Sequence, residues 1–242
     1  ILDGWGLSDK TEYNAIAKAN TPTFDRLWAN SPHTTLRTDG LAVGLPEGQF
    51  GNSEVGHTNI GAGRVVMQDL PRISQAASEG TLAGNDALKS FITELKTSGG
   101  AAHLMGLVSD GGVHAHQDHI VALANILHVS GVKTHVHVFT DGRDTPPTSA
   151  AGYVAKLLVD LPASATVATV CGRFDAMDRD NRWGRVSQAV DAIAQAKGAG
   201  FDTALAAIEA GYAANENDEF IKPAVIGDYQ GMKPEDGILS AN

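Results

Sequence analysis

The chain has little of what membrane, secreted or nucleic-acid-binding proteins need. Its single cysteine cannot form an internal disulfide, and the longest stretch free of charged residues runs only from His119 to Val132, shorter than the ~20 residues of a bilayer span. Asp and Glu outnumber Lys and Arg by 28 to 18, and the net charge of -10 opposes binding to nucleic-acid phosphates. We therefore expect a soluble, cytoplasmic protein that binds neither membrane nor nucleic acid.

The chain is nevertheless long enough to fold. Its 242 residues, 43% of them hydrophobic, suffice for one large core or two smaller ones. The sequence opens at Ile1 without an initiator methionine and without a basic start, apolar run and cleavage site in succession. We therefore expect the chain to be a piece of a longer protein.

Three successive units of strand, loop and helix are predicted after residue 87. Apolar runs predict strands at 103–108, 134–139 and 166–170. Helical spacing predicts helices at 117–129, 149–159 and 183–196. This repetition is typical of an α/β protein with a mostly parallel sheet, in which ligands bind at the loops that follow the strands.

The N-terminal part has a different texture. Residues 1–6 are predicted to form a strand that ends in a turn, and residues 21–28 a short helix with Pro22 in its first turn. Residues 44–63 are rich in glycine and are predicted to form a loop.

A change of texture near Gln68 predicts a domain boundary there. The predicted domains are residues 1–67 and residues 68–242. Beyond Phe220 the chain is predicted to be irregular and to stop without a finished element.

Two residues of the N-terminal part are candidates for metal or phosphoryl chemistry. Asp3 follows an apolar stretch and precedes glycines, so it is either a turn residue or a ligand of Mg²⁺ or Mn²⁺. Ser53 is either a helix cap or a nucleophile, since nearby glycines allow a ligand to approach the backbone. A nucleophilic serine needs an activator, and the alternatives are a metal ion and His57, one helical turn further on.

A histidine-rich segment follows the first predicted strand. It has the spacing H-x-H-x-D-H, formed by His114, His116, Asp118 and His119. Zinc hydrolases of the metallo-β-lactamase type use this spacing, so a zinc-dependent hydrolase is one alternative function. The other interpretation is that the following helix packs His119 against the core or exposes it to solvent.

The loops after the second and third strands hold groups suited to a small anion. Arg143 and Asp144 are adjacent in the second loop, where the arginine can bind a carboxylate or phosphate and the aspartate can exchange a proton with a hydroxyl. Four arginines and no lysine lie between residues 172 and 185, among them Arg179 and Arg185. Arginine suits bidentate recognition of phosphate or carboxylate, so we expect a phosphorylated small acid as the substrate.

These residues occur in motifs that resemble one known family. The chain resembles cofactor-independent phosphoglycerate mutase, of the alkaline phosphatase superfamily, from Ile1 to its end. The motifs in question are Leu2-Asp3-Gly4-Trp5-Gly6, Gly51-Asn52-Ser53-Glu54-Val55-Gly56-His57, Asn59-Ile60-Gly61-Ala62-Gly63-Arg64, Ser109-Asp110-Gly111-Gly112-Val113-His114, Asp141-Gly142-Arg143-Asp144 and Met177-Asp178-Arg179-Asp180-Asn181-Arg182-Trp183.

The resemblance implies a fold and an activity. Residues 1–67 would be the N-terminal part of an alkaline-phosphatase-like, metal-binding domain, and residues 68–242 an inserted α/β transferase domain. The implied enzyme is an isomerase of glycolysis that interconverts 2-phosphoglycerate and 3-phosphoglycerate through a phosphoserine intermediate. It would use two divalent metal ions, Mn²⁺ foremost with Mg²⁺ as the alternative, and no 2,3-bisphosphoglycerate. We expect a monomer.

The resemblance also implies roles for individual residues. Ser53 would be the nucleophile and, with Asp3, a metal ligand. Asp144 would be catalytic as a general acid and base, and the substrate would be bound by His114, Arg143, Asp144, Arg179 and Arg185. His116 and His119 match no metal role in the family.

The sequence departs from the family in two ways. Phe50 stands where methionine is usual, a change that touches none of these roles. Family members are about twice as long, so most metal ligands and further substrate-binding residues would follow Asn242. A chain that ended at Asn242 is expected to lack the two-metal site and to be inactive.

Overall fold

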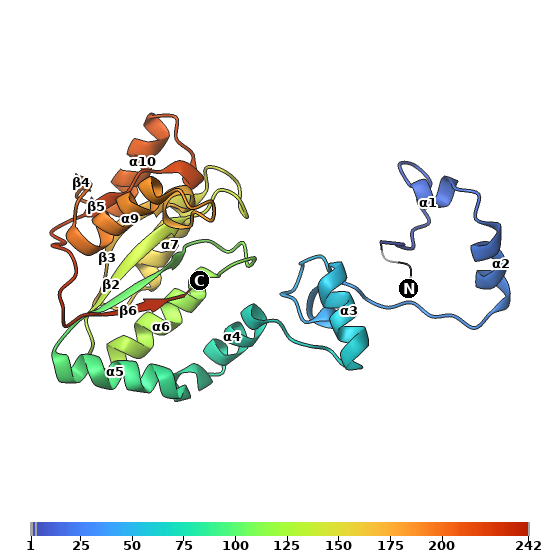
Figure 1. The fold of residues 1–242 in the computed structure, drawn as a ribbon, viewed down its shortest axis with the longest axis horizontal. Coiled ribbons are helices and arrows are strands. Elements are labelled where there is room, and N and C mark those ends of the chain that lie inside the picture. Colours follow the sequence, from blue (N-terminus) through green and yellow to red (C-terminus); the bar gives the residue numbers. More distant parts are fainter. Residues whose placement is uncertain (1, 3, 242) are drawn as a thin grey trace. The chain divides into compact units, whose positions relative to one another are not determined.

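The computed structural model describes residue 2 and residues 4–241. The chain divides into two compact units, Ile1–Gln68 and Asp69–Asn242. Figure 1 shows the second unit as a sheet covered by helices, whereas the described residues of the first form short helices and connecting segments. None of the helices in this described part is long and apolar enough to cross a membrane.

The second unit is built on a sheet of six strands in the order β4-β5-β3-β2-β1-β6. The strands are β1 (Ala102–Leu107), β2 (Thr134–Thr140), β3 (Ala165–Gly172), β4 (Ala199–Phe201), β5 (Ala224–Ile226) and β6 (Gly237–Ser240). Every pairing is parallel except that of β3 with β5. The prediction of an α/β fold with a mostly parallel sheet is confirmed.

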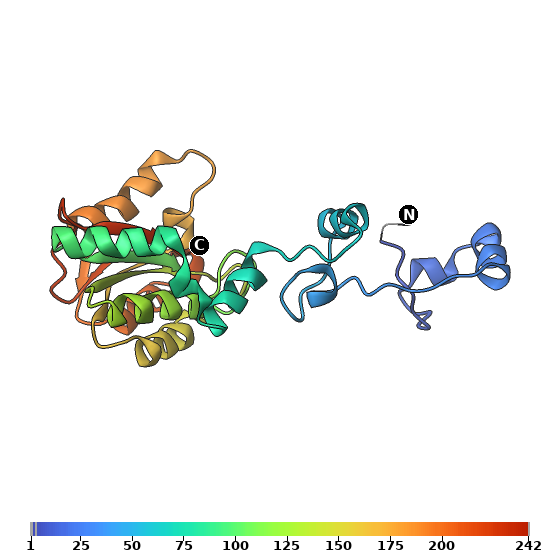
Figure 2. The ribbon, with the colours of Figure 1, turned by 90° about the horizontal axis from the view of Figure 1, so that it is seen from below.

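Helices cover both faces of this sheet, as Figure 2 shows. The helical segments are α4 (Asp69–Ser78), η2 (Thr81–Gly84), α5 (Asp86–Ser98), α6 (Gln117–Val129), α7 (Ala150–Asp160), α8 (Arg173–Ala176), α9 (Trp183–Gln195), α10 (Ala204–Ala213) and η3 (Asp218–Phe220). The predicted strands and helices of the three repeated units are confirmed to within two residues at each end. The predicted third loop, however, contains the short helix α8.

The main core explains why the central strands are nearly continuous apolar runs. Leu104 and Val136 point to the face that α6, α7 and α10 cover, where Ile120, Val154 and Ile208 are fully buried. Leu107 and Phe139 point to the other face, against α9. Strands buried on both faces need apolar residues at consecutive positions.

The end of the chain was predicted to be irregular, and that prediction is wrong. Residues 224–226 form β5, and residues 237–240 form β6, which pairs in parallel with β1 from Ala102↔Gly237 to Met105↔Ser240. These strands have only three and four residues. They form because an existing strand satisfies their backbone groups, which local periodicity does not reveal.

The first unit consists of α1 (Ala15–Lys18), α2 (Pro22–Asn30), η1 (Gly40–Val43) and α3 (Ser53–Ala62). The predicted helix at 21–28 is confirmed as α2, which begins at Pro22 because proline needs no backbone donor in a first turn.

Two predictions for the first unit are wrong within the described residues. The loop expected at 44–63 contains α3, which Asn52 caps by accepting a hydrogen bond from the Val55 N–H at 3.0 Å. The strand expected at 1–6 is absent from residue 2 and residues 4–6, which pair with no described strand. Ile1 and Asp3 lie outside the described residues.

Candidate active site

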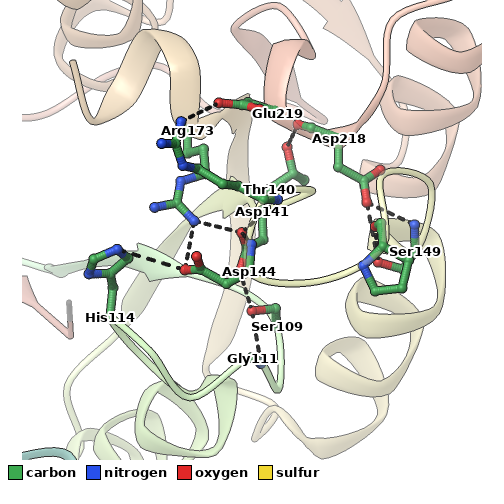
Figure 3. Close-up of polar contacts among 12 residues, drawn as sticks. Ser109, Gly111, His114, Thr140, Asp141, Asp144, Ser149, Arg173, Asp218 and Glu219 are labelled. Carbon is green, nitrogen blue, oxygen red and sulfur yellow. Dashed lines mark hydrogen bonds and ion pairs between the residues drawn. The ribbon is translucent and has the colours of Figure 1, made fainter. Parts of the chain in front are cut away.

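Three loops of the second unit follow β1, β2 and β3. These strands are parallel neighbours, so their carboxyl ends lie at one edge of the sheet. The loops comprise residues 108–116, residues 141–149, and α8 with residues 177–182. Side-chain contacts join all three, and we call this set of residues the loop cluster (Figure 3).

Asp141 is the central anchor of the loop cluster. It lies immediately after β2, is 2% exposed, and accepts a hydrogen bond on Oδ2 from the Ser109 hydroxyl at 2.7 Å. Its Oδ1 accepts the backbone N–H groups of Arg143 at 3.2 Å and Asp144 at 3.0 Å. Asp141 therefore ties the first loop to the second and fixes the backbone of the Arg143-Asp144 pair.

Arg173 joins the third loop to the same place. It opens α8, and its side chain is 9% exposed. Its Nη1 donates to Asp141 Oδ1 at 2.7 Å and to Asp144 Oδ2 at 2.8 Å. One buried guanidinium thus bridges two carboxylates.

The surroundings keep these groups ionised. Burial raises the pKa of Asp141, but hydrogen bonds from the Asp144 backbone, Ser109 and Arg173 outweigh it and hold this pKa below its usual value. Burial lowers the pKa of Arg173, but its two carboxylate partners outweigh burial and raise this pKa. The loop cluster is therefore a site of fixed charge.

The Asp144 carboxylate is held on one side only. Oδ2 contacts Arg173, and His114 Nε2 lies 3.9 Å from the same oxygen. Among the described residues no side chain bonds to Oδ1 of Asp144. That oxygen is therefore placed to accept a proton from a ligand hydroxyl or to donate one to a ligand oxygen.

Two glycines allow the loops to pack this closely. A Cβ on Gly111 would lie 3.1 Å from Cβ of Asp144. A Cβ on Gly142, which has a positive φ of +70°, would lie 2.8 Å from Cβ of Asp218. Both motifs therefore need glycine for the approach of the neighbouring loop.

Asp218, in η3, supports the second loop from behind. It is fully buried, and its Oδ2 accepts the backbone N–H groups of Ser149 at 2.8 Å and Ala150 at 2.9 Å, where α7 begins. Its carbonyl accepts the Thr140 hydroxyl at 2.7 Å (Figure 3). Both ends of the second loop are thus fixed by one residue.

The arginines that sequence reasoning selected differ in how they are held. Arg185 Nη1 lies 3.2 Å from Asp178 Oδ1, and its guanidinium stacks 3.8 Å from the Phe174 ring centroid. Arg143 is exposed, with Nη1 3.6 Å from Glu219 Oε1. Arg179 is exposed and forms no ion pair with any described residue.

Taken together, the structure brings His114 to Asp144 and places Arg143 beside it. Arg185 instead contacts Asp178 and Phe174, and Phe174 packs on Phe220 of η3 with the ring centroids 4.8 Å apart. Sequence reasoning missed the supporting residues Ser109, Asp141, Arg173 and Asp218. The first three stand at or next to strand ends, which was the available signal.

The zinc alternative is not supported by the structure. His116 Nδ1 accepts the backbone N–H of Asp118 at 3.2 Å, and buried His119 pairs its Nε2 with Ser74 Oγ at 2.8 Å. Burial lowers the pKa of His119. No group of three or more potential His, Cys, Asp or Glu ligands occurs in the part of the chain that the structure describes.

Ser53 belongs to the first unit, where it is exposed at the start of α3. Its Oγ lies 3.2 Å from His57 Nδ1, and this nitrogen lies 2.8 Å from the Ser53 carbonyl oxygen. Because a carbonyl oxygen only accepts, Nδ1 carries the hydrogen in this arrangement and is not free to take the serine proton. The geometry therefore disfavours His57 as the base. The cap of α3 is Asn52, not Ser53.

A pocket of about 720 Å³ lies beside the loop cluster in the second unit. It is bounded by α4, α5, α6 and the end of β6, and its lining is mainly apolar. His114 contributes to it, but Asp144 and the arginines do not. Its lining is therefore unsuited to a small dianion.

Comparison with known proteins was made for the whole chain. A family described as "BPG-independent PGAM N-terminus" matches residues 73–242. The chain is 59% identical to the 2,3-bisphosphoglycerate-independent phosphoglycerate mutase of Gluconobacter oxydans and 61% identical to that of Rhodopseudomonas palustris. Both matches cover all 242 residues and 48% of the relative.

A solved structure supports the same relationship. The crystal structure of Leishmania mexicana phosphoglycerate mutase at low cobalt concentration matches with a TM-score of 0.77 and 29% identity. The match covers 100% of this chain and 47% of that one, so the chain spans about half the length of the relatives it matches. The chain therefore belongs to the BPG-independent phosphoglycerate mutase family, of which it forms the N-terminal part.

Proposed function

We propose that the full-length protein carrying this chain interconverts 2-phosphoglycerate and 3-phosphoglycerate without 2,3-bisphosphoglycerate. The names of the relatives support this activity. The observation that carries the proposal is the Asp144 carboxylate, held by Arg173 at 2.8 Å with one oxygen left for a ligand and with cationic side chains in the adjoining loops. We further propose that this is an isomerase of cytoplasmic glycolysis that acts as a monomer.

The loop cluster suits the charge of a phosphoglycerate. In our proposal Arg143, Arg179 and Arg185 bind its phosphate and carboxylate, and His114 contributes a further donor. Arginine presents donors in a planar fork that matches such oxygens. An acidic protein that gathers cations at one place favours a small anion over a polyanion.

Ser53 and Asp144 divide the chemistry in this proposal. The phosphoryl group passes from one glycerate oxygen to Ser53 Oγ, the Ser53 hydroxyl releases its proton to solvent, and protonated Asp144 gives a proton to the glycerate oxygen that is released. The other glycerate hydroxyl then attacks the phosphoserine, Asp144 takes the proton of that hydroxyl, and the released Ser53 oxygen takes a proton back from solvent. Asp144 ends each cycle in the state in which it began.

We propose that residues 1–67 belong to a metal-binding phosphatase domain and residues 68–242 to a transferase domain. Two divalent ions, Mn²⁺ or Mg²⁺, would be bound with the help of Asp3 and Ser53. The described residues do not form such a site by themselves, and Asp3 lies outside them. Further ligands must therefore come from the part of the relatives' length that this chain does not cover, and we assign no step to the ions.

The test uses the full-length protein that carries this chain. We expect mutase activity that a chelator abolishes and Mn²⁺ restores, and we expect acid-quenched protein to contain phosphoserine at position 53 by mass spectrometry. Ser53→Ala should abolish both turnover and phosphorylation, whereas Ser8→Ala, an exposed serine of the same unit, should change neither. Mutase activity retained by Ser53→Ala, or none in the unaltered protein, would contradict the proposal.

A further inference from the structure

We infer that Arg173 is a positioning residue for the mutase reaction, which acts by holding the Asp144 carboxyl group in place. This inference rests on the proposed function, in which Asp144 exchanges protons with the substrate. Arg173 itself makes no contact with the substrate in this account.

The contacts of Arg173 favour a role beyond fold stability. Its Nη1 donates both to Asp141, which anchors backbone, and to Asp144, which has an oxygen available to a ligand. Asp141 already receives Ser109 and two backbone N–H groups. Support of the loop alone therefore does not require the second contact, from Arg173 to the side chain of Asp144.

The position of the cation has a chemical consequence. Arg173 sits on Oδ2, so proton exchange with a ligand is directed to Oδ1. The same geometry holds Oδ1 in one place, which lowers the entropic cost of reaching a reactive arrangement with the ligand.

The expected result of removing this cation is a loss of rate and not of affinity. Full-length Arg173→Met should have a kcat lowered about 100-fold, because a misplaced acid-base group loses much of its effect. The KM should change less than about threefold, since the substrate-binding arginines and His114 remain. Arg173→Lys keeps the charge and should recover part of the lost kcat.

A double-mutant cycle with Asp144→Asn isolates the mechanism. If Arg173 acts through Asp144, Arg173→Met should lower kcat much less in an Asp144→Asn protein than in the unaltered one. Arg72→Met is the matched control, since it removes an exposed arginine 2.9 Å from Asp69 in the same unit and should leave kcat unchanged.

The inference is overturned by equal losses in both backgrounds, by a rise in KM that accounts for the loss, or by a kcat like that of the unaltered protein. Circular dichroism checks that each variant folds. If Arg173→Met does not fold, the same cycle is run with Arg173→Lys, and full additivity there is equally decisive. An unaltered protein without mutase activity would instead refute the proposed function itself.

Discussion

Two buried networks in the second unit satisfy their polar side chains in different ways. The loop cluster holds fixed charges, with Arg173 between Asp141 and Asp144. The second network, here called the histidine chain, lies on the face of the sheet that α9 covers. It consists of Asp236, His103, His137 and Thr169, with successive polar contacts of 3.2, 2.8 and 2.8 Å.

The contacts of the histidine chain are all satisfied with both imidazoles neutral. The Thr169 hydroxyl donates to His137 Nδ1, His137 Nε2 donates to His103 Nδ1, and His103 Nε2 donates to Asp236 Oδ2, with hydrogens assigned from the partners. With this assignment, a second proton on His103 Nδ1 would face the hydrogen on His137 Nε2. Burial lowers the pKa of His103 and lowers that of His137 to about 3.

The difference indicates why we propose a reaction at the loop cluster and not at the histidine chain. Both are buried and hydrogen-bonded, but the loop cluster ends at Asp144 and half-exposed His114, where a ligand can reach it. The histidine chain ends at Thr169 and Asp236, both closed off within the fold. Access to solvent, and not buried polarity alone, is our reason for proposing the loop cluster as the functional site.

The largest expected effect is on kcat, when the carboxyl group of Asp144 is removed from the loop cluster. Asp144→Asn in the full-length protein should lower kcat about 1000-fold, because the amide cannot exchange the proton, while binding of phosphoglycerate persists. Stopped assays give kcat, and calorimetry gives the dissociation constant. Asp69→Asn, which removes an exposed carboxylate of the same unit, is the control. Losses of similar size in rate and affinity would reduce Asp144 to a binding residue.

The next largest expected effect is on stability, when His137 is removed from the histidine chain. His137→Ala should lower the free energy of unfolding by about 3 kcal/mol, because it leaves a cavity and strands the Thr169 and His103 partners. Below its unfolding temperature the full-length variant should keep its kcat. Exposed His128→Ala, measured by urea unfolding in parallel, should lose less than about 1 kcal/mol. If His137→Ala lowered kcat as well as stability, the result would contradict our claim that the histidine chain has no part in turnover.

A third prediction separates the networks by pH. The unfolded chain protonates His137 near its usual pKa of about 6.5, whereas the folded chain resists protonation down to about 3. Stability should therefore fall as the pH drops below about 6.5, by about 2 to 3 kcal/mol at about pH 4.5 for this residue. Urea titrations of the unaltered chain and of His137→Gln test it, since the variant should lose this dependence.

Asp141 responds in a different range. The lowered pKa of this carboxyl means that its stabilising contacts persist above its usual value near 4 and are lost only as the pH falls further. Identical pH curves for the unaltered chain and His137→Gln between about pH 6.5 and about pH 4.5 would show that His137 does not supply the acid sensitivity.

The smallest expected effect comes from removing one neutral hydrogen-bond donor from the loop cluster. Ser109→Ala deletes the 2.7 Å hydrogen bond to Asp141 and should lower the free energy of unfolding by about 1 kcal/mol. The full-length variant should lose only a few-fold in kcat, because Arg173 still holds Asp144. Ser187→Ala, on exposed α9 surface, is the matched control. A kcat loss as large as that of Asp144→Asn would show that Asp141, and not Arg173, governs the site.

Local pattern was sufficient for the central sheet and insufficient for its edges. The strands β1, β2 and β3 are long apolar runs followed by helices, so periodicity finds them. By contrast, β6 has four residues and depends on pairing with β1, and α3 is hidden by glycines although Asn52 caps it. Such elements are decided by partners distant in sequence.

Residues of the candidate site could be predicted where a motif directly follows a strand. They could not be predicted where their contacts join residues distant in sequence. The adjacency of Arg143 and Asp144 after β2 identified the second loop. Arg173 directly follows β3, but its contacts with Asp141 and Asp144 span about thirty residues, and no local pattern predicts them. The histidine spacing suggested zinc, but the side chain of His119 turns to Ser74, which a linear motif does not show.

The most direct test of the central claim is a crystal structure of the full-length protein with 3-phosphoglycerate bound. We predict the ligand at the loop cluster, with its free hydroxyl on Oδ1 of Asp144, Arg173 still on Oδ2, and its anionic groups on His114 and the arginines. A ligand bound elsewhere, such as in the apolar pocket between α4, α5 and α6, with Asp144 untouched, would contradict the account.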